Sequence, residues 1–186
     1  VIIGELKNDK VEYRPMTSCL LPMGELHGKH LVTIEGLNME HLSPVQDAMV
    51  DCGGTQCGYC TPGFVVCMTA GLMAPQVPLN DEGALYAISG NLCRCTGYRS
   101  IKNAGIQAIE SLRDQLSNKE RIEALVEAKA LPNFFLGIAE RLKAIKPDEI
   151  LQNGLNDRGS TIMAGGTDLY VQRGEQLAES PIVLLN

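Results

Sequence analysis

Two cysteine-bearing stretches decide how this chain is interpreted: Gln56-Cys57-Gly58-Tyr59-Cys60-Thr61-Pro62-Gly63-Phe64 and Gly90-Asn91-Leu92-Cys93-Arg94-Cys95-Thr96-Gly97-Tyr98-Arg99. Each stretch places two cysteines directly before a pattern that begins a helix. The helix dipole and the unpaired backbone N–H groups at a helix start lower thiol pKa values and favour thiolates. Four thiolates that converge between helix ends suit a Cys₄ metal site. The two turns are therefore expected to form one metal centre.

The spacing of the four cysteines does not choose the metal. A structural zinc site often uses C-x-x-C pairs, and a [2Fe-2S] cluster also takes four cysteine thiolates. A thioredoxin-like redox pair would need a βαβ context, which does not surround Cys57 and Cys60. From spacing alone, zinc and an iron–sulfur cluster have equal weight.

Composition excludes several classes of protein. The chain has 186 residues, of which 45% are hydrophobic and 20% charged, as in globular proteins. A net charge of -6 and an aromatic content of 4% argue against a nucleic-acid partner. No apolar stretch is long enough to span a bilayer, and no signal peptide is recognisable. We therefore expect a cytoplasmic protein without a membrane partner, and its odd count of seven cysteines does not suggest a disulfide framework.

The middle of the chain, residues 39–117, has four helical patterns. Ser43 and Pro44 begin the first pattern with Gln46 at the capping-box position, and Gly53-Gly54 ends it. The other three are expected at 63–74, at 81–89 after an Asn80 cap, and at 100–116. These helices predict a compact bundle.

The flanking segments differ from this bundle in pattern. Residues 1–38 are β-rich, with expected strands at 1–3, 10–14 and 31–35 and a turn at Asn8-Asp9. Residues 118–145 are charged and are expected to form a linker with one or two amphipathic helices. Residues 146–186 contain a helix start at Lys146 and strand patterns at 161–164 and 182–185, the second without a visible sheet to join.

The two cysteine stretches resemble the helical [2Fe-2S] domain of the molybdenum hydroxylases, which include xanthine dehydrogenases, aldehyde oxidoreductases and carbon monoxide dehydrogenases. The string from His41 to Val50 is similar to the first helix of that domain. The order of segments resembles the iron–sulfur/FAD small subunit of xanthine dehydrogenases. The resemblance implies an α+β chain: the C-terminal part of a plant ferredoxin-like β-grasp domain (1–38), a four-helix [2Fe-2S] domain (39–117), a linker (118–145) and the start of an α/β FAD-binding domain (146–186).

The resemblance also implies roles for single residues. The helical cluster would be held by Cys57, Cys60, Cys93 and Cys95, and Gln56 would contact the molybdopterin cofactor. Cys19 matches the last ligand of a plant-type ferredoxin cluster and serves as a ligand only if three upstream cysteines exist. Without them it is expected to be a half-buried thiol. Cys52 and Cys67 match no ligand position and are expected to pack on helices, and His27, His30 and His41 are expected to be satisfied or solvent-facing.

The C-terminal segment resembles a flavin-binding loop, whose residues would be Ile162, Met163, Ala164, Gly165, Gly166, Thr167, Asp168 and Leu169. This is a partial FAD site, and residues 146–186 are expected to bind no FAD alone. The implied function is electron relay from molybdopterin on a catalytic partner subunit or domain, through [2Fe-2S] to FAD and NAD, in a dimer of heterodimers. The alternatives are a zinc-stabilised helical interaction module and a stand-alone helical [2Fe-2S] ferredoxin.

Overall fold

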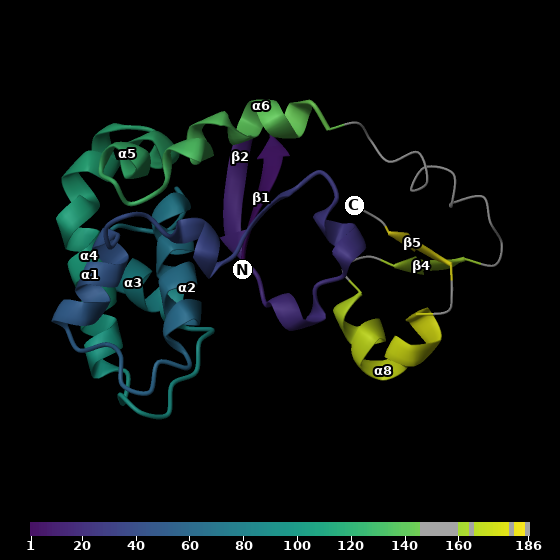
Figure 1. The fold of residues 1–186 in the computed structure, drawn as a ribbon, viewed down its shortest axis with the longest axis horizontal. Helices are drawn as coiled ribbons and strands as arrows, with labels where there is room; N and C mark the ends of the chain where they lie inside the picture. The colour runs from purple at the N-terminus through teal and green to yellow at the C-terminus, as the bar shows by residue number, and fades with distance from the viewer. Residues whose placement is uncertain (146–159, 164–165, 179–180, 185–186) are drawn as a thin grey trace.

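The computed structural model describes residues 1–145, 160–163, 166–178 and 181–184 (Figure 1). Its mixture of helices and small sheets agrees with the expected α+β class. Within the described residues, no helix combines the length and the hydrophobicity that crossing a bilayer requires.

An antiparallel sheet of three strands is built from the first 32 residues. Strands β1 (Ile2–Lys7) and β2 (Lys10–Pro15) form a hairpin, and β3 (His30–Val32) pairs with the other edge of β1. Asn8 and Asp9 adopt φ values of 48° and 66°, as a two-residue hairpin turn that follows the strand twist requires. The predicted hairpin is confirmed.

The third strand is shorter than expected. It ends at Val32, and residues Ile34–Leu37 form the 3₁₀ helix η3. The expectation of a strand through Glu35 is therefore wrong. The turn of η3 brings Leu37 into the hydrophobic core, where it is 3% exposed, and burial of that side chain outweighs the strand pattern.

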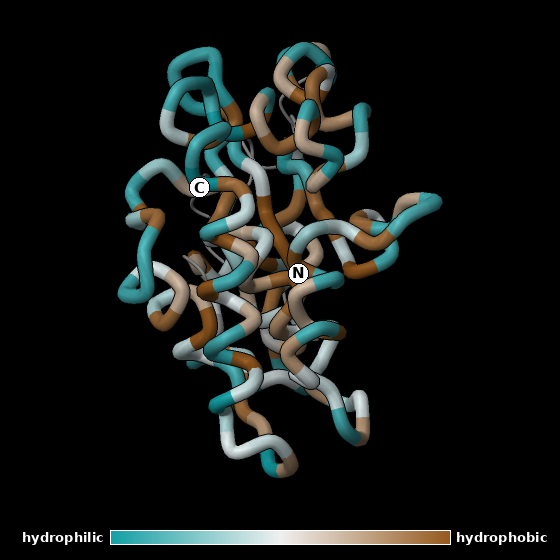
Figure 2. Tube along the Cα trace, turned by 90° about the vertical axis from the view of Figure 1, so that its left-hand side faces the viewer, coloured by the Kyte–Doolittle hydropathy of each residue, from teal (hydrophilic) through white to brown (hydrophobic). Residues whose placement is uncertain are grey.

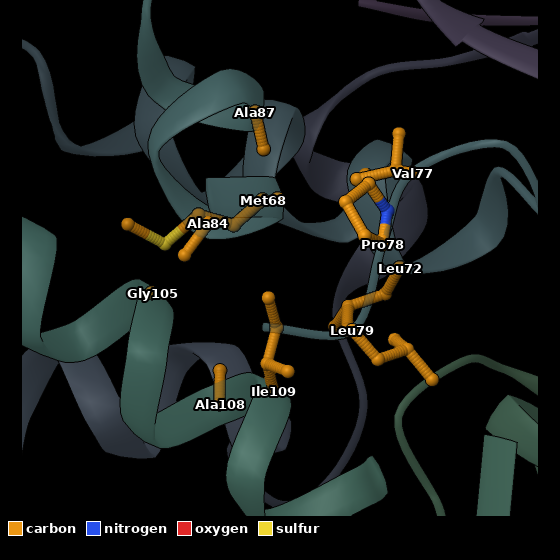
Figure 3. A pocket seen from close by; sticks show the side chains of 12 residues that line it. Met68, Leu72, Val77, Pro78, Leu79, Ala84, Ala87, Gly105, Ala108 and Ile109 are labelled. Carbon is orange, nitrogen blue, oxygen red and sulfur yellow. The ribbon is translucent and has the colours of Figure 1, made fainter. Parts of the chain in front are cut away.

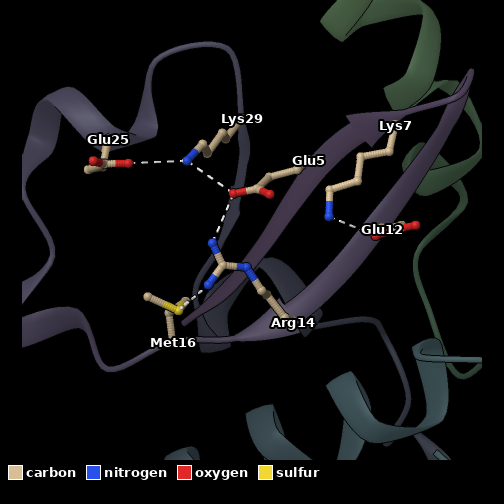
Figure 4. Close-up of polar contacts among 7 residues, drawn as sticks. All are labelled: Glu5, Lys7, Glu12, Arg14, Met16, Glu25 and Lys29. Carbon is tan, nitrogen blue, oxygen red and sulfur yellow. Dashed lines mark hydrogen bonds and ion pairs between the residues drawn. The ribbon is translucent and has the colours of Figure 1, made fainter. Parts of the chain in front are cut away.

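Charged side chains attach the segment after β2 to the sheet. This segment contains the 3₁₀ helices η1 (Ser18–Leu20) and η2 (Met23–Leu26). Figure 4 shows that Glu5 on β1 lies between Arg14 and Lys29, at N–O distances of 2.9 and 3.0 Å, and that Lys29 also contacts Glu25 at 3.3 Å. Glu25 is buried, so the ammonium group of Lys29 compensates a carboxylate that has lost much of its water.

The structure contains the helices α1 (Pro44–Asp51), α2 (Thr61–Met73), α3 (Asp81–Ile88) and α4 (Arg99–Asn118), and each begins within two residues of its expected start. Ser43 and Gln46 form the expected capping box, with N–O distances of 2.7 and 3.3 Å. The Asn80 side chain accepts a hydrogen bond from the Gly83 amide at 3.0 Å. These caps satisfy N–H groups that have no partner inside a helix.

A shared hydrophobic core holds these helices together. Helix α1 packs against α4, and α3 packs against both α2 and α4. In Figure 2, many of the residues coloured as hydrophobic lie along the inner parts of the chain trace, whereas many outer turns are hydrophilic. A small cavity of about 10 Å³ remains between α2, α3 and α4, bordered by Met68, Gly71, Ala87 and Gly105 (Figure 3). Its lining is apolar and offers a water molecule little to bind.

The segment expected to be a linker, residues 118–145, packs against both the helices and the sheet. It contains α5 (Arg121–Glu127), η4 (Asn133–Gly137) and α6 (Ile138–Lys143), which Figure 1 shows beyond the end of α4 and above the sheet. Leu125 and Phe135 are buried in the common core. The Arg121 guanidinium donates to the carbonyl oxygen of Leu72 at 3.1 Å. Most of the segment is thus part of a packed body.

Aromatic rings fix the far end of this segment to the sheet. The Phe135 ring lies 5.7 Å from the Tyr13 ring and 5.3 Å from the His30 ring, between centroids. The Tyr13 hydroxyl lies 3.0 Å from Nδ1 of His30, so this histidine is satisfied as expected. Burial and the nearby Arg141 lower the pKa of His30 to about 4, which keeps the ring neutral at pH 7.

The C-terminal described residues form a βαβ unit. Strands β4 (Thr161–Met163) and β5 (Ile182–Leu184) pair in parallel, and α8 (Thr167–Ala178) lies between them in the sequence. The expectation that the last strand has no sheet to join is wrong. Helix α8 supplies the crossover that parallel strands need. The helix expected from Lys146 lies outside the described residues.

Candidate metal centre

The four candidate ligands lie in two turns that face each other. Cys57 and Cys60 are in the turn between α1 and α2, and Cys60 is the N-cap residue of α2. Cys93 and Cys95 are in the turn between α3 and α4. The Cys95 thiol contacts Cys57, with 3.4 Å between the sulfurs, and Cys93 lies near enough to Cys60 to raise the pKa of the Cys60 thiol. Each pair therefore contains one cysteine from each turn.

In each pair, one thiol has a lowered pKa and the other has a raised pKa. The Tyr59 amide and the Cys95 thiol, both directed at the Cys57 sulfur, lower the pKa of Cys57. The Thr96 hydroxyl and amide lower the pKa of Cys93 to about 7. Burial and the neighbouring Cys93 raise the pKa of Cys60, and donation to Cys57 raises that of Cys95. One thiol in each pair thus ionises readily, and its partner keeps a proton. A metal ion that binds both sulfurs can take the place of that proton.

The backbone of both turns enters the left-handed region. Gly58 has φ of 83° in the first turn, and Gly97 has φ of 65° in the second. Tyr98 follows with φ of 67°, a rare conformation for a bulky residue. Its hydroxyl accepts a hydrogen bond from the Cys93 amide at 2.9 Å, and its ring packs edge-on against Phe64. These two contacts hold Tyr98 in that conformation.

The donor set fits a two-iron cluster. In a [2Fe-2S] cluster each iron is bound by two protein ligands, and four cysteine thiolates are the common set. The described thiols are all sulfur donors and come together as two pairs. Among the described residues, no three or more histidine, cysteine or acidic side chains surround a single ion position. Thiols that meet two at a time instead suit a cluster in which each iron takes two of them.

Gln56 and Cys19, the other predicted residues of the cluster sites, are both exposed. Gln56 lies beside Cys57 on the surface of the first turn. Cys19 lies in η1 and is exposed, so the expectation of a half-buried thiol is wrong, because the short 3₁₀ turn leaves the side chain outside the sheet. Cys19 borders an open groove of about 1120 Å³ that Tyr59, Cys67 and Leu92 also line.

The two cysteines predicted to be packing residues are partly buried. Cys67 lies on α2. Cys52 follows α1, and its thiol donates to Oε1 of Gln107 on α4 at 3.1 Å. Neither thiol meets the four candidate ligands among the described hydrogen bonds, and both positions agree with a packing role.

The predicted flavin loop is a junction between a strand and a helix. Ile162 and Met163 belong to β4, and Thr167, Asp168 and Leu169 begin α8. Ala164 and Gly165 lie outside the described residues. Gly166 has φ of 67°, and a Cβ atom there would collide with the Met163 side chain. A helix start after a glycine is a common place for phosphate binding. The loop is predicted by the sequence, whereas the helix α8 that follows it is not.

Comparison with known proteins indicates an iron–sulfur domain in this part of the chain. Residues 33–106 match the family model of a [2Fe-2S] binding domain. Aldehyde oxidase 1 of Cavia porcellus is 44% identical over 98 residues, which cover 52% of this chain and 7% of that protein. Xanthine dehydrogenase of Oryza sativa subsp. japonica is 40% identical over 97 residues, covering 51% of this chain and 7% of the relative. The chain thus matches a small part of the length of these relatives.

A solved structure is also similar. Quinoline 2-oxidoreductase from Pseudomonas putida 86 has a TM-score of 0.47 and 32% sequence identity, covering 60% of this chain and 67% of that chain. Residues 33–106 are a [2Fe-2S] binding domain homologous to the iron–sulfur domains of aldehyde oxidases and xanthine dehydrogenases.

Proposed function

We propose that this chain is an electron-relay component of a molybdenum hydroxylase, and that Cys57, Cys60, Cys93 and Cys95 hold its [2Fe-2S] cluster. The observation that supports this most directly is the contact between the two turns, with 3.4 Å between the sulfurs of Cys57 and Cys95. Cys93 also lies near enough to Cys60 to raise its pKa. Each pair would bind one iron. When bound, such a cluster accepts and releases single electrons.

The surface next to the cysteines suits a partner. Tyr59 is 95% exposed and Leu92 is 85% exposed, and both lie beside the candidate ligands. Large apolar side chains gathered on a surface often mark an interface. We infer that a catalytic domain or subunit with molybdopterin covers this surface and that exposed Gln56 contacts the cofactor. A dimer of heterodimers is part of the same proposal.

The βαβ unit supports a route by which electrons leave the cluster for a flavin. The glycine at the start of α8 and the free N–H groups of that helix suit the pyrophosphate of FAD. We propose that residues 162–169 supply part of a flavin site, from which electrons reach NAD, and that Cys19 holds a further cluster only with ligands from elsewhere. Residues 146–186 alone bind FAD too weakly to quench its fluorescence at micromolar concentration, because contacts from the rest of a site are lacking.

Iron analysis of paired cysteine variants tests the cluster. Protein purified without oxygen is expected to be brown, to contain about two iron atoms per chain, and to give an EPR signal on reduction. Cys60→Ser is expected to lose the iron, whereas Cys67→Ser on the same helix keeps it. A colourless protein with one zinc per chain would instead support the zinc-stabilised module, and about four irons would indicate a second cluster involving Cys19.

A glutamine variant tests the contact with the catalytic partner. Gln56→Ala is expected to keep the visible and EPR spectra of the cluster and to slow its reduction by substrate in the assembled enzyme. Gln76→Ala, another exposed glutamine, serves as the control and is expected to leave the rate unchanged. An unaltered rate in Gln56→Ala would show that electrons do not need this contact.

A further inference from the structure

Three residues of the second cysteine turn form a closed ring of hydrogen bonds. The Cys93 amide donates to the Tyr98 hydroxyl at 2.9 Å. The Tyr98 amide donates to Oγ1 of Thr96 at 3.2 Å. Thr96 in turn contacts the Cys93 sulfur twice, through Oγ1 at 3.1 Å and through its amide at 3.5 Å. All these contacts join residues at most five positions apart, so the ring is local to the turn.

The direction of the hydroxyl contact follows from chemistry. A cysteine sulfur bound to iron is a thiolate and has no proton to donate, so the Thr96 O–H must donate to it. Oγ1 of Thr96 already accepts a hydrogen bond from the Tyr98 amide. Because hydrogen bonds in a chain polarise one another, this bond strengthens the Thr96 hydroxyl as a donor. The Cys93 sulfur therefore receives a strengthened O–H donor in addition to the Thr96 amide.

A threonine with a different partner directly follows the first cysteine turn, at the start of α2. Thr61 directly follows Cys60, and its hydroxyl lies 3.1 Å from the hydroxyl of Thr55. Thr61 is thus close to a candidate ligand in sequence, but its described hydroxyl contact is to another hydroxyl. The two threonines form a matched pair for experiment.

We propose that Thr96 sets the reduction potential of the cluster through its hydrogen bonds to the Cys93 sulfur, and that Tyr98 positions Thr96. This inference rests on the proposed function, since it requires that Cys93 binds iron. Reduction adds one electron and one unit of negative charge to the cluster and its thiolates. Hydrogen bonds to the sulfurs stabilise that charge and raise the potential.

The test is a redox titration of the intact chain with its cluster, in which dithionite supplies the electron and EPR measures the reduced fraction. Thr96→Val keeps the shape of the side chain and removes the hydroxyl. At a fixed potential the ratio of reduced to oxidised cluster is expected to fall several-fold, where a tenfold fall in this ratio equals about 59 mV for a one-electron couple. Thr96→Ser restores the hydroxyl and is expected to return the midpoint to that of the unaltered chain, and Thr61→Val is expected not to move it.

Iron content, measured on every variant, separates the possible failures. A full complement of iron in Thr96→Val with an unmoved midpoint overturns this inference and leaves the proposed function intact. Zinc in place of iron in the unaltered chain overturns both. If Thr96→Val cannot retain iron, Tyr98→Phe is the test variant, because it removes the hydroxyl that accepts the hydrogen bond of the Cys93 amide. This variant is expected to lower the midpoint potential of the cluster. An unmoved or higher midpoint potential would contradict the inference. Tyr59→Phe, at an exposed tyrosine, is its control.

Discussion

The two cysteine turns present their thiols in the same way on different backbones. In the first turn, two residues separate Cys57 from Cys60, and glycine occupies the left-handed position at residue 58. In the second turn one residue separates Cys93 from Cys95, and the left-handed residues are Gly97 and Tyr98. Both turns nevertheless supply one readily ionised thiol and one that keeps its proton.

The second turn shows that a side chain can stabilise a conformation that normally favours glycine. A left-handed conformation costs a bulky residue about 1–2 kcal/mol. The hydrogen bond from Cys93 to the Tyr98 hydroxyl and the packing of its ring on Phe64 offset that cost. The first turn needs no such stabilising contact at residue 58, because glycine adopts the left-handed conformation without steric cost.

The helix that follows each turn contains one glycine at the cavity between α2, α3 and α4, and these two glycines are expected to respond oppositely to alanine. In α2, a Cβ atom at Gly71 would lie 2.8 Å from Cβ of Ala87. In α4, a Cβ atom at Gly105 would meet Ala84 and Met68 at 3.4 and 3.5 Å. Overpacking costs about 1–3 kcal/mol, and alanine in a helix interior is about 1 kcal/mol better than glycine.

Gly71→Ala is therefore expected to lower the free energy of unfolding, and Gly105→Ala to raise it, with a difference of about 2 kcal/mol between them. Chemical denaturation of the two variants beside the unaltered chain measures this difference. Equal stabilities would show that α2 and α3 can separate slightly without cost and that the two helices are equivalent supports for their turns.

Alanine at the left-handed glycines is expected to cost about 1 kcal/mol or slightly more in either turn, from backbone conformation alone. The reason is that a Cβ atom at Gly58 or Gly97 meets no atom within 4 Å. Gly90→Ala serves as the control, because Gly90 is equally open and has no left-handed φ. Thermal unfolding of the three variants measures the effect, and a much larger loss at Gly97 than at Gly58 would mean that strain at Tyr98 adds to it.

Thiol labelling is expected to show the smallest effect, a several-fold difference in rate within each turn. In reduced, cluster-free protein, Cys57 and Cys93 are expected to react with iodoacetamide before Cys95 and Cys60. Because the pKa of Cys93 is lowered to about 7, its labelling rate is expected to rise between pH 6 and 8 and then level off, as the thiolate fraction does. Mass spectrometry of peptides after short labelling times measures each site, and equal rates would contradict the division of protons within the pairs.

Local signals in the sequence predicted the helices and the position of both cysteine turns. The Ser43 capping box and the Asn80 cap act over three or four residues, so they are recognisable from neighbours in the chain. The hairpin turn at Asn8 and Asp9 is of the same kind. These signals predict where the elements begin and end, and the family resemblance added which cysteines are expected to serve as ligands.

Contacts between distant segments required the tertiary structure. The pairing of Cys57 with Cys95 and of Cys60 with Cys93 depends on how α2 and α4 pack, which no local pattern records. The burial of Leu125 and Phe135 in a segment that reads as a charged linker, and the parallel partner of β5, have the same origin. The sequence by itself determined the elements and the thiols, because helix caps and turns are decided by near neighbours. The tertiary structure decided which thiols meet and which residues support them, because those contacts are chosen by packing across the whole core.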